Sequence, residues 1–209
     1  MKLYTKLYTV ALFSVLALSV SACRLSINFH EVDPGKFYRS AQLTGEEFQI
    51  AIDQVGIRTI INLRGEGPGE AWFEDEEAVA SRNGVQLVNI GMSARRFPHR
   101  EDLLKLLDTL ETADRPILVH CQMGADRTGE ASAIYQMLYQ GKTKAQAMKM
   151  LSPVYYHIEA LMPAKDAFVR IFKGRDWAYD EYDPCLLDTR YYNHEKFCLR
   201  KSMAKIKER

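Results

Sequence analysis

The residues of this chain best suited to chemistry stand together in the stretch 120–129, which reads His-Cys-Gln-Met-Gly-Ala-Asp-Arg-Thr-Gly. A strand pattern precedes it and a helix pattern follows it, and a tight loop in that context directs backbone N–H groups and a helix N-terminus at a phosphate. Gly124 allows a close approach of the backbone. Cys121 is the candidate nucleophile, because loop dipoles and a nearby guanidinium favour its thiolate. Arg127 can fold back and bind two phosphoryl oxygens as a fork, so the stretch predicts a nucleophilic phosphate site.

Strands and helices alternate along the chain and place this loop at the end of a strand. Compact apolar or β-branched runs predict strands at 37–40, 57–63, 85–90 and 116–120. Amphipathic stretches predict helices at about 45–54, 70–82, 99–112 and 128–139, the first opened by Thr44 with Glu47 at capping-box spacing. The alternation predicts a single α/β domain with a central, mostly parallel sheet of four to five strands flanked by helices. Functional loops gather at the carboxyl ends of strands in such sheets, and Cys121 follows one.

The chain resembles the protein tyrosine and dual-specificity phosphatase superfamily, because residues 120–128 match the pattern His-Cys-x5-Arg-[Ser/Thr] at each defined position. Tyr38-Arg39-Ser40 and Ile61-Asn62-Leu63-Arg64 resemble the early strand segments of compact bacterial members, so the resemblance covers about residues 30–172. It implies a dual-specificity-phosphatase-like fold and a reaction in two steps. In these steps Cys121 attacks phosphorus to form a phosphocysteine, and water then hydrolyses that intermediate. The resemblance implies no metal and no cofactor.

The resemblance also implies roles for the other residues of the loop. Thr128 is expected to help the sulfur leave in the second step. The phosphoryl oxygens are expected to bind Arg127 and the loop residues Gln122, Met123, Gly124 and Ala125.

The source of the proton for the leaving oxygen departs from the superfamily pattern. Members of the superfamily most often use an Asp on a loop before the nucleophile, but residues 89–96 contain no carboxylate. Asp126 resembles the Asp in the Gly-x-Asp-Arg loop of myotubularin-like lipid phosphatases and of secreted bacterial phosphatases that accept phosphoinositides. We therefore expect Asp126 to be the proton donor. The alternative is that Asp126 orients the loop amides or pairs with Arg39 or Arg64.

Other basic residues lie near the expected site. Arg39 and Arg64 end adjacent strand segments and are expected to form fold-supporting ion pairs, with Glu66 and Glu70 as candidate partners. A further basic group consists of Arg95, Arg96, His99 and Arg100. This group could attract a polyanion such as an inositol phosphate, or it could be no more than a solvated surface.

Residues 1–22 have the pattern of a secretory signal peptide. Their apolar run, 10–20, is shorter than the roughly 20 residues that span a bilayer. The run ends before Ser-Ala-Cys, and Cys23 at this place resembles the lipidated cysteine of a bacterial lipobox. The resemblance implies a lipid anchor in the cell envelope, facing the periplasm, and Arg24 favours the outer membrane if the bacterium is Gram-negative. The alternative is an ordinary cleaved signal in which Cys23 is incidental.

The mature chain divides by composition into a phosphatase domain, 23–175, and a C-terminal extension, 176–209, in which little secondary structure is expected. The extension contains Cys185 and Cys198. Export would permit a disulfide between them, which would contribute about 3 kcal/mol by chain-entropy reasoning. Two free thiols are the alternative.

The charge of the whole chain limits the classes of partner. The formal net charge of +1 excludes a strong global attraction to nucleic acid, and we expect a monomer. The first functional expectation is a phosphatase of phosphotyrosine and phosphoserine/threonine. The alternatives are a phosphoinositide or inositol phosphate phosphatase with the same mechanism, and an inactive pseudophosphatase that only binds phosphate.

Overall fold

The computed structural model describes residues 28–198, so Cys23 and the expected signal peptide lie outside the described residues. The strands are β1 (His30–Asp33), β2 (Phe37–Ser40), β3 (Thr59–Asn62), β4 (Gln86–Asn89) and β5 (Ile117–His120). They form one sheet in the order β1-β2-β5-β3-β4, in which β1 is antiparallel to β2 and the other pairs are parallel. The predicted α/β domain with a mostly parallel sheet is confirmed.

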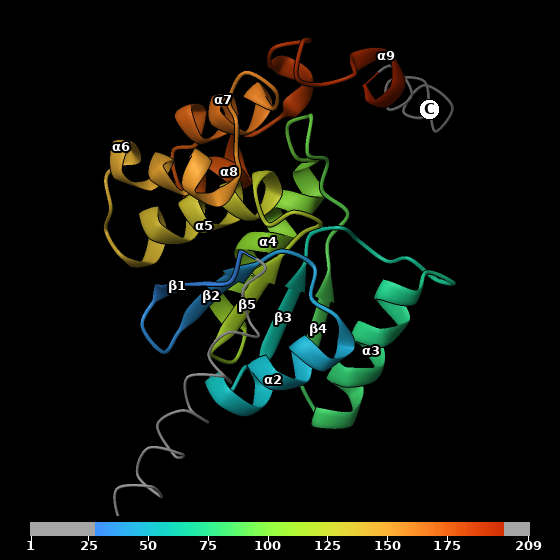
Figure 1. Ribbon diagram of the computed structural model, residues 1–209. Coiled ribbons are helices and arrows are strands. Elements are labelled where there is room, and N and C mark those ends of the chain that lie inside the picture. Colours follow the sequence, from blue (N-terminus) through green and yellow to red (C-terminus); the bar gives the residue numbers. More distant parts are fainter. Residues whose placement is uncertain (1–27, 199–209) are drawn as a thin grey trace, which may run out of the picture.

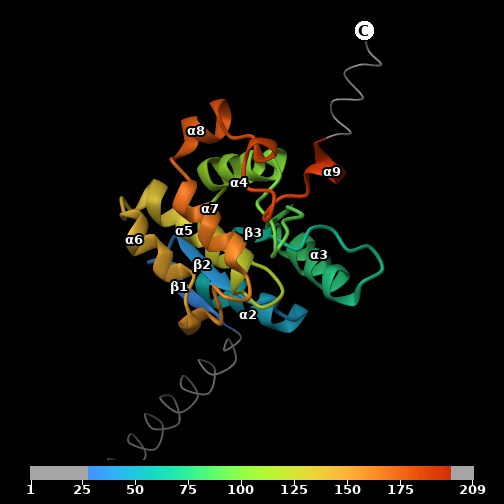
Figure 2. The ribbon, with the colours of Figure 1, turned by 90° about the horizontal axis from the view of Figure 1, so that it is seen from above.

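Helices cover both faces of the sheet (Figures 1 and 2). The helices are α2 (Gly45–Val55), α3 (Ala71–Asn83), α4 (Arg100–Thr112), α5 (Asp126–Tyr139), α6 (Lys144–Ala147), α7 (Pro163–Ile171), α8 (Arg175–Asp180) and α9 (His194–Phe197). Helices α2 and α3 lie on one face, and α4, α5, α7 and α8 lie on the other. The capping box at the start of α2 is present, because Thr44 Oγ1 accepts from the Glu47 amide and Glu47 Oε2 accepts from the Thr44 amide.

The two cores follow from the alternation of side chains along the central strands. Ile60 and Leu118 point to the core beneath α2 and α3, whereas Ile61 and Val119 point to the larger core beneath α4, α5 and α7. All four side chains are fully buried. A strand with an apolar core on both sides reads as a continuous apolar run, which explains the sequence of β3 and β5.

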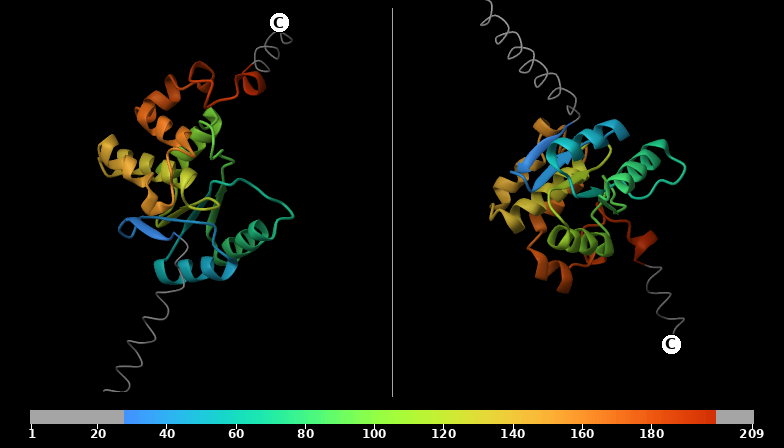
Figure 3. Two further views of the ribbon diagram at one scale, coloured as in Figure 1. Left: turned by 45° about the horizontal axis from the view of Figure 1, so that its top comes forward. Right: turned by 90° about the horizontal axis from the view of Figure 1, so that it is seen from below.

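The C-terminal segment differs from the expectation of an appendage with little secondary structure. Helix α8 begins at Arg175, across the expected boundary, and Ala178, Tyr182 and Tyr192 are buried in the larger core. Figure 3 shows this segment, coloured orange to red, beside α4 and α7 and away from α2 and α3. Composition suggested an appendage because the segment is polar, but its apolar and aromatic side chains point inward and extend the core.

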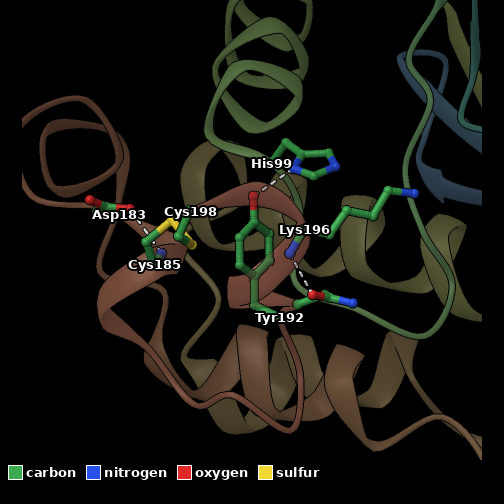
Figure 4. The surroundings of a disulfide bond; sticks show 7 residues. His99, Asp183, Cys185, Tyr192, Lys196 and Cys198 are labelled. Atoms are coloured by element: carbon green, nitrogen blue, oxygen red, sulfur yellow. Dashed lines mark hydrogen bonds between the residues drawn. A yellow bond between two sulfur atoms is a disulfide. The ribbon is translucent and has the colours of Figure 1, made fainter. Parts of the chain in front are cut away.

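A disulfide closes the end of this segment. Cys185 and Cys198 are joined, with their Cα atoms 5.8 Å apart, which is the pairing that the sequence left open. Figure 4 shows the bond beside Tyr192, whose hydroxyl lies 2.6 Å from His99 Nδ1. The disulfide therefore joins the last described residue to Cys185 within the C-terminal segment, and the contact between Tyr192 and His99 connects this segment to the start of α4.

Candidate active site

Cys121 lies where three strands end together. It follows β5, which lies between β2 and β3 with Ser40, His120 and Asn62 in register. Its side chain is buried, and it is the free cysteine of the described residues. Helix α5 begins at Asp126, so residues 121–125 form a loop between the carboxyl end of a central strand and the N-terminus of a helix.

The carbonyl groups of this loop are bound from outside. The Gln122 carbonyl accepts a hydrogen bond from Gln42 N at 3.2 Å. The Met123 carbonyl accepts from Asn28 Nδ2 at 3.0 Å, and the Gly124 carbonyl accepts from Arg39 Nη2 at 2.6 Å. In a planar trans peptide the N–H points opposite to the C=O, so the N–H groups of residues 123–125 point to the inner side of the loop. None of the N–H groups of residues 122–125 donates to another group within residues 28–198. The loop therefore presents unpaired donors to an anion.

Gly124 is required by the packing of the loop against β2. Its φ is +67°, and a Cβ there would lie 2.6 Å from the Ser40 carbonyl atoms and from the Ala41 amide nitrogen. Both neighbours are backbone atoms, which cannot move aside as a flexible side chain can. Only glycine fits this position.

Arg127 and Thr128 complete the cradle from the first turn of α5. Arg127 Nη1 donates to the carbonyls of Leu63 at 3.1 Å and Met92 at 3.4 Å, which hold the side chain across the ends of β3 and β4. Its Nε is buried without a partner among the described residues, as is the Thr128 hydroxyl. An unpaired guanidinium N–H and an unpaired hydroxyl beside the loop are donors available to a bound phosphoryl group and to the sulfur.

A buried chain of hydrogen bonds supports the loop from below. His120 Nε2 donates to Glu76 Oε1 at 2.8 Å, and both side chains are fully buried. Glu76 Oε2 accepts from Gln42 Nε2 at 3.0 Å, and Gln42 Oε1 accepts from Arg64 Nη1 at 2.8 Å. This chain fixes the residue before Cys121 and places Arg64 near the site.

Arg39 and Arg64 do not form the ion pairs expected from the sequence. Within residues 28–198 neither guanidinium pairs with a carboxylate, and neither Glu66 nor Glu70 binds them. Arg39 is fully buried, donates to the Gly124 and Met150 carbonyls, and lies 3.9 Å from the Tyr155 ring centroid. Burial lowers the pKa of Arg39 to about 10, so it remains charged at neutral pH.

Arg64 lies near Arg127 and also near the carboxylates of Glu76 and Glu70, which act on it without a direct ion pair. Its guanidinium lies 3.4 Å from the Trp72 ring centroid. Burial, followed by the charge of Arg127, lowers the pKa of Arg64. The influence of Arg127 shows that two guanidinium groups share this edge of the sheet, where their positive charges favour a bound phosphate.

Asp126 bonds to a residue that the sequence analysis missed. His157 lies with Nδ1 2.7 Å from Asp126 Oδ1 and Nε2 2.7 Å from Asp166 Oδ2, and its ring is buried. Burial lowers the pKa of His157, but its hydrogen bonds to the two carboxylates outweigh burial and raise the pKa above the ordinary value. The geometry therefore places the imidazole between two carboxyl groups, which favour its protonated form. No hydrogen bond joins Asp126 to Arg39 or Arg64 within the part of the chain that the structure describes.

The basic residues of the loop before α4 are largely held by the C-terminal half of the chain. His99 bonds to Tyr192, Arg100 donates to the Tyr179 carbonyl, and the Arg96 guanidinium lies over the Phe197 ring. The Arg96 carbonyl accepts from Lys165. Arg96, His99 and Arg100 therefore pack against the C-terminal segment, and Arg95 is exposed.

Lys165, which binds the Arg96 carbonyl in the loop before α4, also forms a buried ion pair. Lys165 Nζ lies 2.6 Å from Glu130 Oε2, and both side chains are fully buried. Burial raises the pKa of Glu130, while Lys165 opposes that shift. The pair joins α7 to α5 one turn after Arg127.

Residues 28–198 contain no group of three or more His, Cys, Asp or Glu side chains placed to hold a metal ion. No helix in the same range is long and apolar enough to cross a membrane.

Comparisons with known proteins agree with this geometry. A family model described as a DSP-PTPase phosphatase fused to NAD+ kinase matches residues 12–170. The chain is 28% identical over 147 residues to the dual specificity protein phosphatase TpbA of Pseudomonas aeruginosa strain UCBPP-PA14. That match covers 69% of this chain and 62% of TpbA, so the chain spans less than two thirds of the length of this curated relative.

Solved structures share the fold. The crystal structure of P. aeruginosa TpbA matches with a TM-score of 0.57 and 25% identity, over 71% of this chain and 86% of that chain. The core catalytic domain of the PP-IP phosphatase SIW14 from S. cerevisiae, in complex with citrate, matches with a TM-score of 0.58 and 24% identity. The latter match covers 70% of this chain and 85% of that chain.

Proposed function

This chain belongs to the family of DSP-PTPase phosphatase domains, and from that membership we propose that it is a cysteine-dependent phosphatase of phosphomonoesters. The observation that carries the proposal is the loop between Cys121 and Arg127. Three of its carbonyls are bound from outside, so its N–H groups face inward beside a guanidinium whose Nε has no partner among the described residues. This arrangement is complementary to a phosphoryl group whose charge grows during transfer.

The proposed reaction has two steps. Cys121 Sγ forms a bond to phosphorus while the bond from phosphorus to the ester oxygen breaks, and that oxygen leaves with a proton. A water oxygen then attacks the phosphocysteine, and the sulfur leaves as a thiolate with release of inorganic phosphate. The unpartnered Thr128 hydroxyl supports its role as a donor to the departing sulfur.

Asp126 is the proposed proton donor for the first step. Its Oδ1 accepts from His157, which fixes the carboxyl group at the start of α5. As proton donor, Asp126 carries its proton on Oδ2, because Oδ1 accepts from His157 Nδ1–H. Once the Oδ2 proton has passed to the leaving oxygen, the His157 ring can supply another along the hydrogen bond to Oδ1. His157 is thus a positioning residue and a proton reserve, and Asp166 orients its ring from the other side.

Two substrate classes fit the proposal. TpbA is named a dual specificity protein phosphatase, and a TpbA variant has been crystallised with pTyr, which supports phosphotyrosine and phosphoserine/threonine as the first class. The second class is phosphoinositides or inositol phosphates, supported by an Asp inside the loop. A pseudophosphatase is the third alternative, but Cys121 and Arg127 are both present and Arg127 is held at the loop.

The location of the protein is likewise a proposal. The sequence of residues 1–23 supports cleavage before Cys23, lipidation of its sulfur and an anchor in the cell envelope, facing the periplasm. We also propose that the chain is a monomer. The disulfide between Cys185 and Cys198 fits an oxidising compartment. In a Gram-negative bacterium, Arg24 supports the outer membrane.

Hydrolysis of p-nitrophenyl phosphate by the purified chain tests the proposed function. Cys121→Ser should abolish turnover, while the matched control Cys185→Ser/Cys198→Ser, which also replaces thiols by hydroxyls, should retain most of it. Acid quenching during turnover of radiolabelled substrate should trap phosphate on Cys121. Full activity of Cys121→Ser, or label on another residue, would contradict the proposal. Phosphate binding without turnover would identify a pseudophosphatase.

A further inference from the structure

The large apolar side chains that remain exposed are concentrated beside the active-site loop. Five of the seven in the described chain form one set, which we call the apolar rim: Met123 (60% exposed), Val154 (72%), Tyr156 (63%), Ile158 (51%) and Leu161 (64%). Scattered exposed apolar residues need no explanation, whereas a concentration at one place marks an interaction surface.

Hydrogen bonds place the rim at the mouth of the site. A single amide group, Asn28 Nδ2, donates to the carbonyl of Met123 in the loop and to the carbonyl of Tyr155 in the segment 152–162. From the same segment, His157 reaches Asp126. The loop that bears Met123 and the segment 152–162 that bears the rest of the rim therefore lie side by side.

The rim carries little net charge. Glu159 is the sole carboxylate of the segment 152–162, and Arg170 neutralises it with a contact of 2.7 Å. Tyr156 has a φ of +65°, a conformation that residues other than glycine rarely adopt. The Tyr156 side chain is 63% exposed, so this segment leaves an aromatic ring in solvent.

The chain length before Asn28 identifies the occupant of this face. Only residues 24–27 separate Cys23 from Asn28, and five residue steps span at most about 18 Å when fully extended. A lipid on Cys23 would therefore hold the bilayer surface within about 18 Å of the Asn28 Cα atom. Asn28 is itself bonded to the active-site loop and to the segment that bears the rim. An anchor this short leaves the rim close to the bilayer.

We propose that the apolar rim inserts into the surface of the bilayer that holds the lipid on Cys23, and that the adjacent loop acts on phosphomonoesters of membrane lipids. The inference rests on the proposed function and on lipidation of Cys23. Burial of apolar side chains in the headgroup region adds to the hold of the anchor and orients the protein. The cradle then opens toward the lipid headgroups.

Quenching by brominated lipids tests the docking without any use of activity. The full chain is produced with its signal, purified in detergent and reconstituted into vesicles of phosphatidylethanolamine and phosphatidylglycerol with brominated acyl chains. Val154→Trp should be quenched well beyond the parent protein. Leu186→Trp is the matched control, because Leu186 is 81% exposed but lies in the C-terminal segment. It should show no added quenching.

A second measurement tests the substrate class. Phosphatidic acid in the same vesicles and soluble p-nitrophenyl phosphate are compared for Val154→Asp/Leu161→Asp and for the control Leu186→Asp. The rim variant should lose about tenfold or more on vesicular phosphatidic acid with unchanged hydrolysis of the soluble ester, because charged side chains oppose insertion. The control should change neither.

Each result has a separate meaning. Equal quenching at positions 154 and 186 overturns the docking, as does a rim that proves to bind a second copy of the chain on the vesicle. Equal losses in the rim variant and the control overturn the lipid substrate class. Absence of p-nitrophenyl phosphate turnover in the parent protein contradicts the proposed function, and the quenching still decides the docking.

Discussion

The role of Asp126 can be tested by Asp126→Asn, which removes the transferable proton and keeps the shape of the side chain. The Asn oxygen can still accept the hydrogen bond that His157 donates to Asp126 Oδ1 at 2.7 Å. The start of α5 and the loop should therefore keep their geometry. A change in rate can then be attributed to the proton.

The structure sets the size of the expected effect. A positioned general acid contributes about 10²–10⁴-fold in rate. The Asp126 side chain is 16% exposed, so water can partly replace it, and we expect a loss of about 10²–10³-fold for a poor leaving group. Phenol is such a group, because its pKa is close to the value of about 10 for tyrosine. The more acidic p-nitrophenol leaves with little help, and its ester should lose less than about tenfold.

The assay compares kcat on phenyl phosphate and on p-nitrophenyl phosphate for the parent protein, Asp126→Asn and Asp166→Asn. Asp166 is a matched control because it bonds to the same imidazole at the same distance but lies on α7, outside the loop. Its variant should show a similar small loss on both esters. Equal losses of Asp126→Asn on the two esters would refute the assignment of Asp126 as the proton donor.

Three further predictions follow from other contacts. Gly124→Ala should lower kcat on p-nitrophenyl phosphate by about 10²-fold or more, because its Cβ would clash with β2 backbone and displace the loop; an unchanged kcat would contradict this account. Lys165→Met should lower the free energy of unfolding in urea by about 3–5 kcal/mol, because Glu130 is left buried without its cation, and Lys165→Met/Glu130→Leu should recover most of it. The pKa of His157 is raised in the folded protein, so protonated His157 adds its full contribution to the free energy of unfolding below about pH 6.5. This contribution is lost as pH rises through the folded-state pKa. The melting temperature of the parent protein should therefore fall over this interval, and that of His157→Gln should fall less.

Features encoded by neighbouring residues could be predicted from the sequence. The capping box of Thr44 and Glu47, the apolar runs of β3 and β5, and the loop between Cys121 and Arg127 each depend on a few adjacent positions. Strand β1 was missed because its four residues, His-Glu-Val-Asp, are mostly polar and lie at the edge of the sheet. An edge strand with little burial carries almost no periodic signal.

Residues that act across the fold could not be predicted. His157 lies 31 positions after Asp126, and nothing near it in the sequence indicates a carboxylate partner. Asn28 reaches Met123 over 95 positions, and Arg39 reaches Gly124 over 85. The position of Arg39 at the end of a strand beside β5 did indicate that it lies near the loop. Its charge suggested a carboxylate partner, but the structure gives it the Gly124 carbonyl of the loop instead.

The missing ion pairs explain how the loop can bind an anion. In the described chain, Arg39, Arg64 and Arg127 bond to carbonyl or amide oxygens and none of them to a carboxylate, whereas the nearby carboxylates are taken by other cations and by neutral donors. Had Glu66 or Glu70 paired with one of these arginines, the edge of the sheet would carry less positive charge, and a phosphate would have to displace a carboxylate in order to bind that arginine. Carbonyl oxygens satisfy the donors without cancelling the charge. The positive field therefore remains available to a bound phosphoryl group.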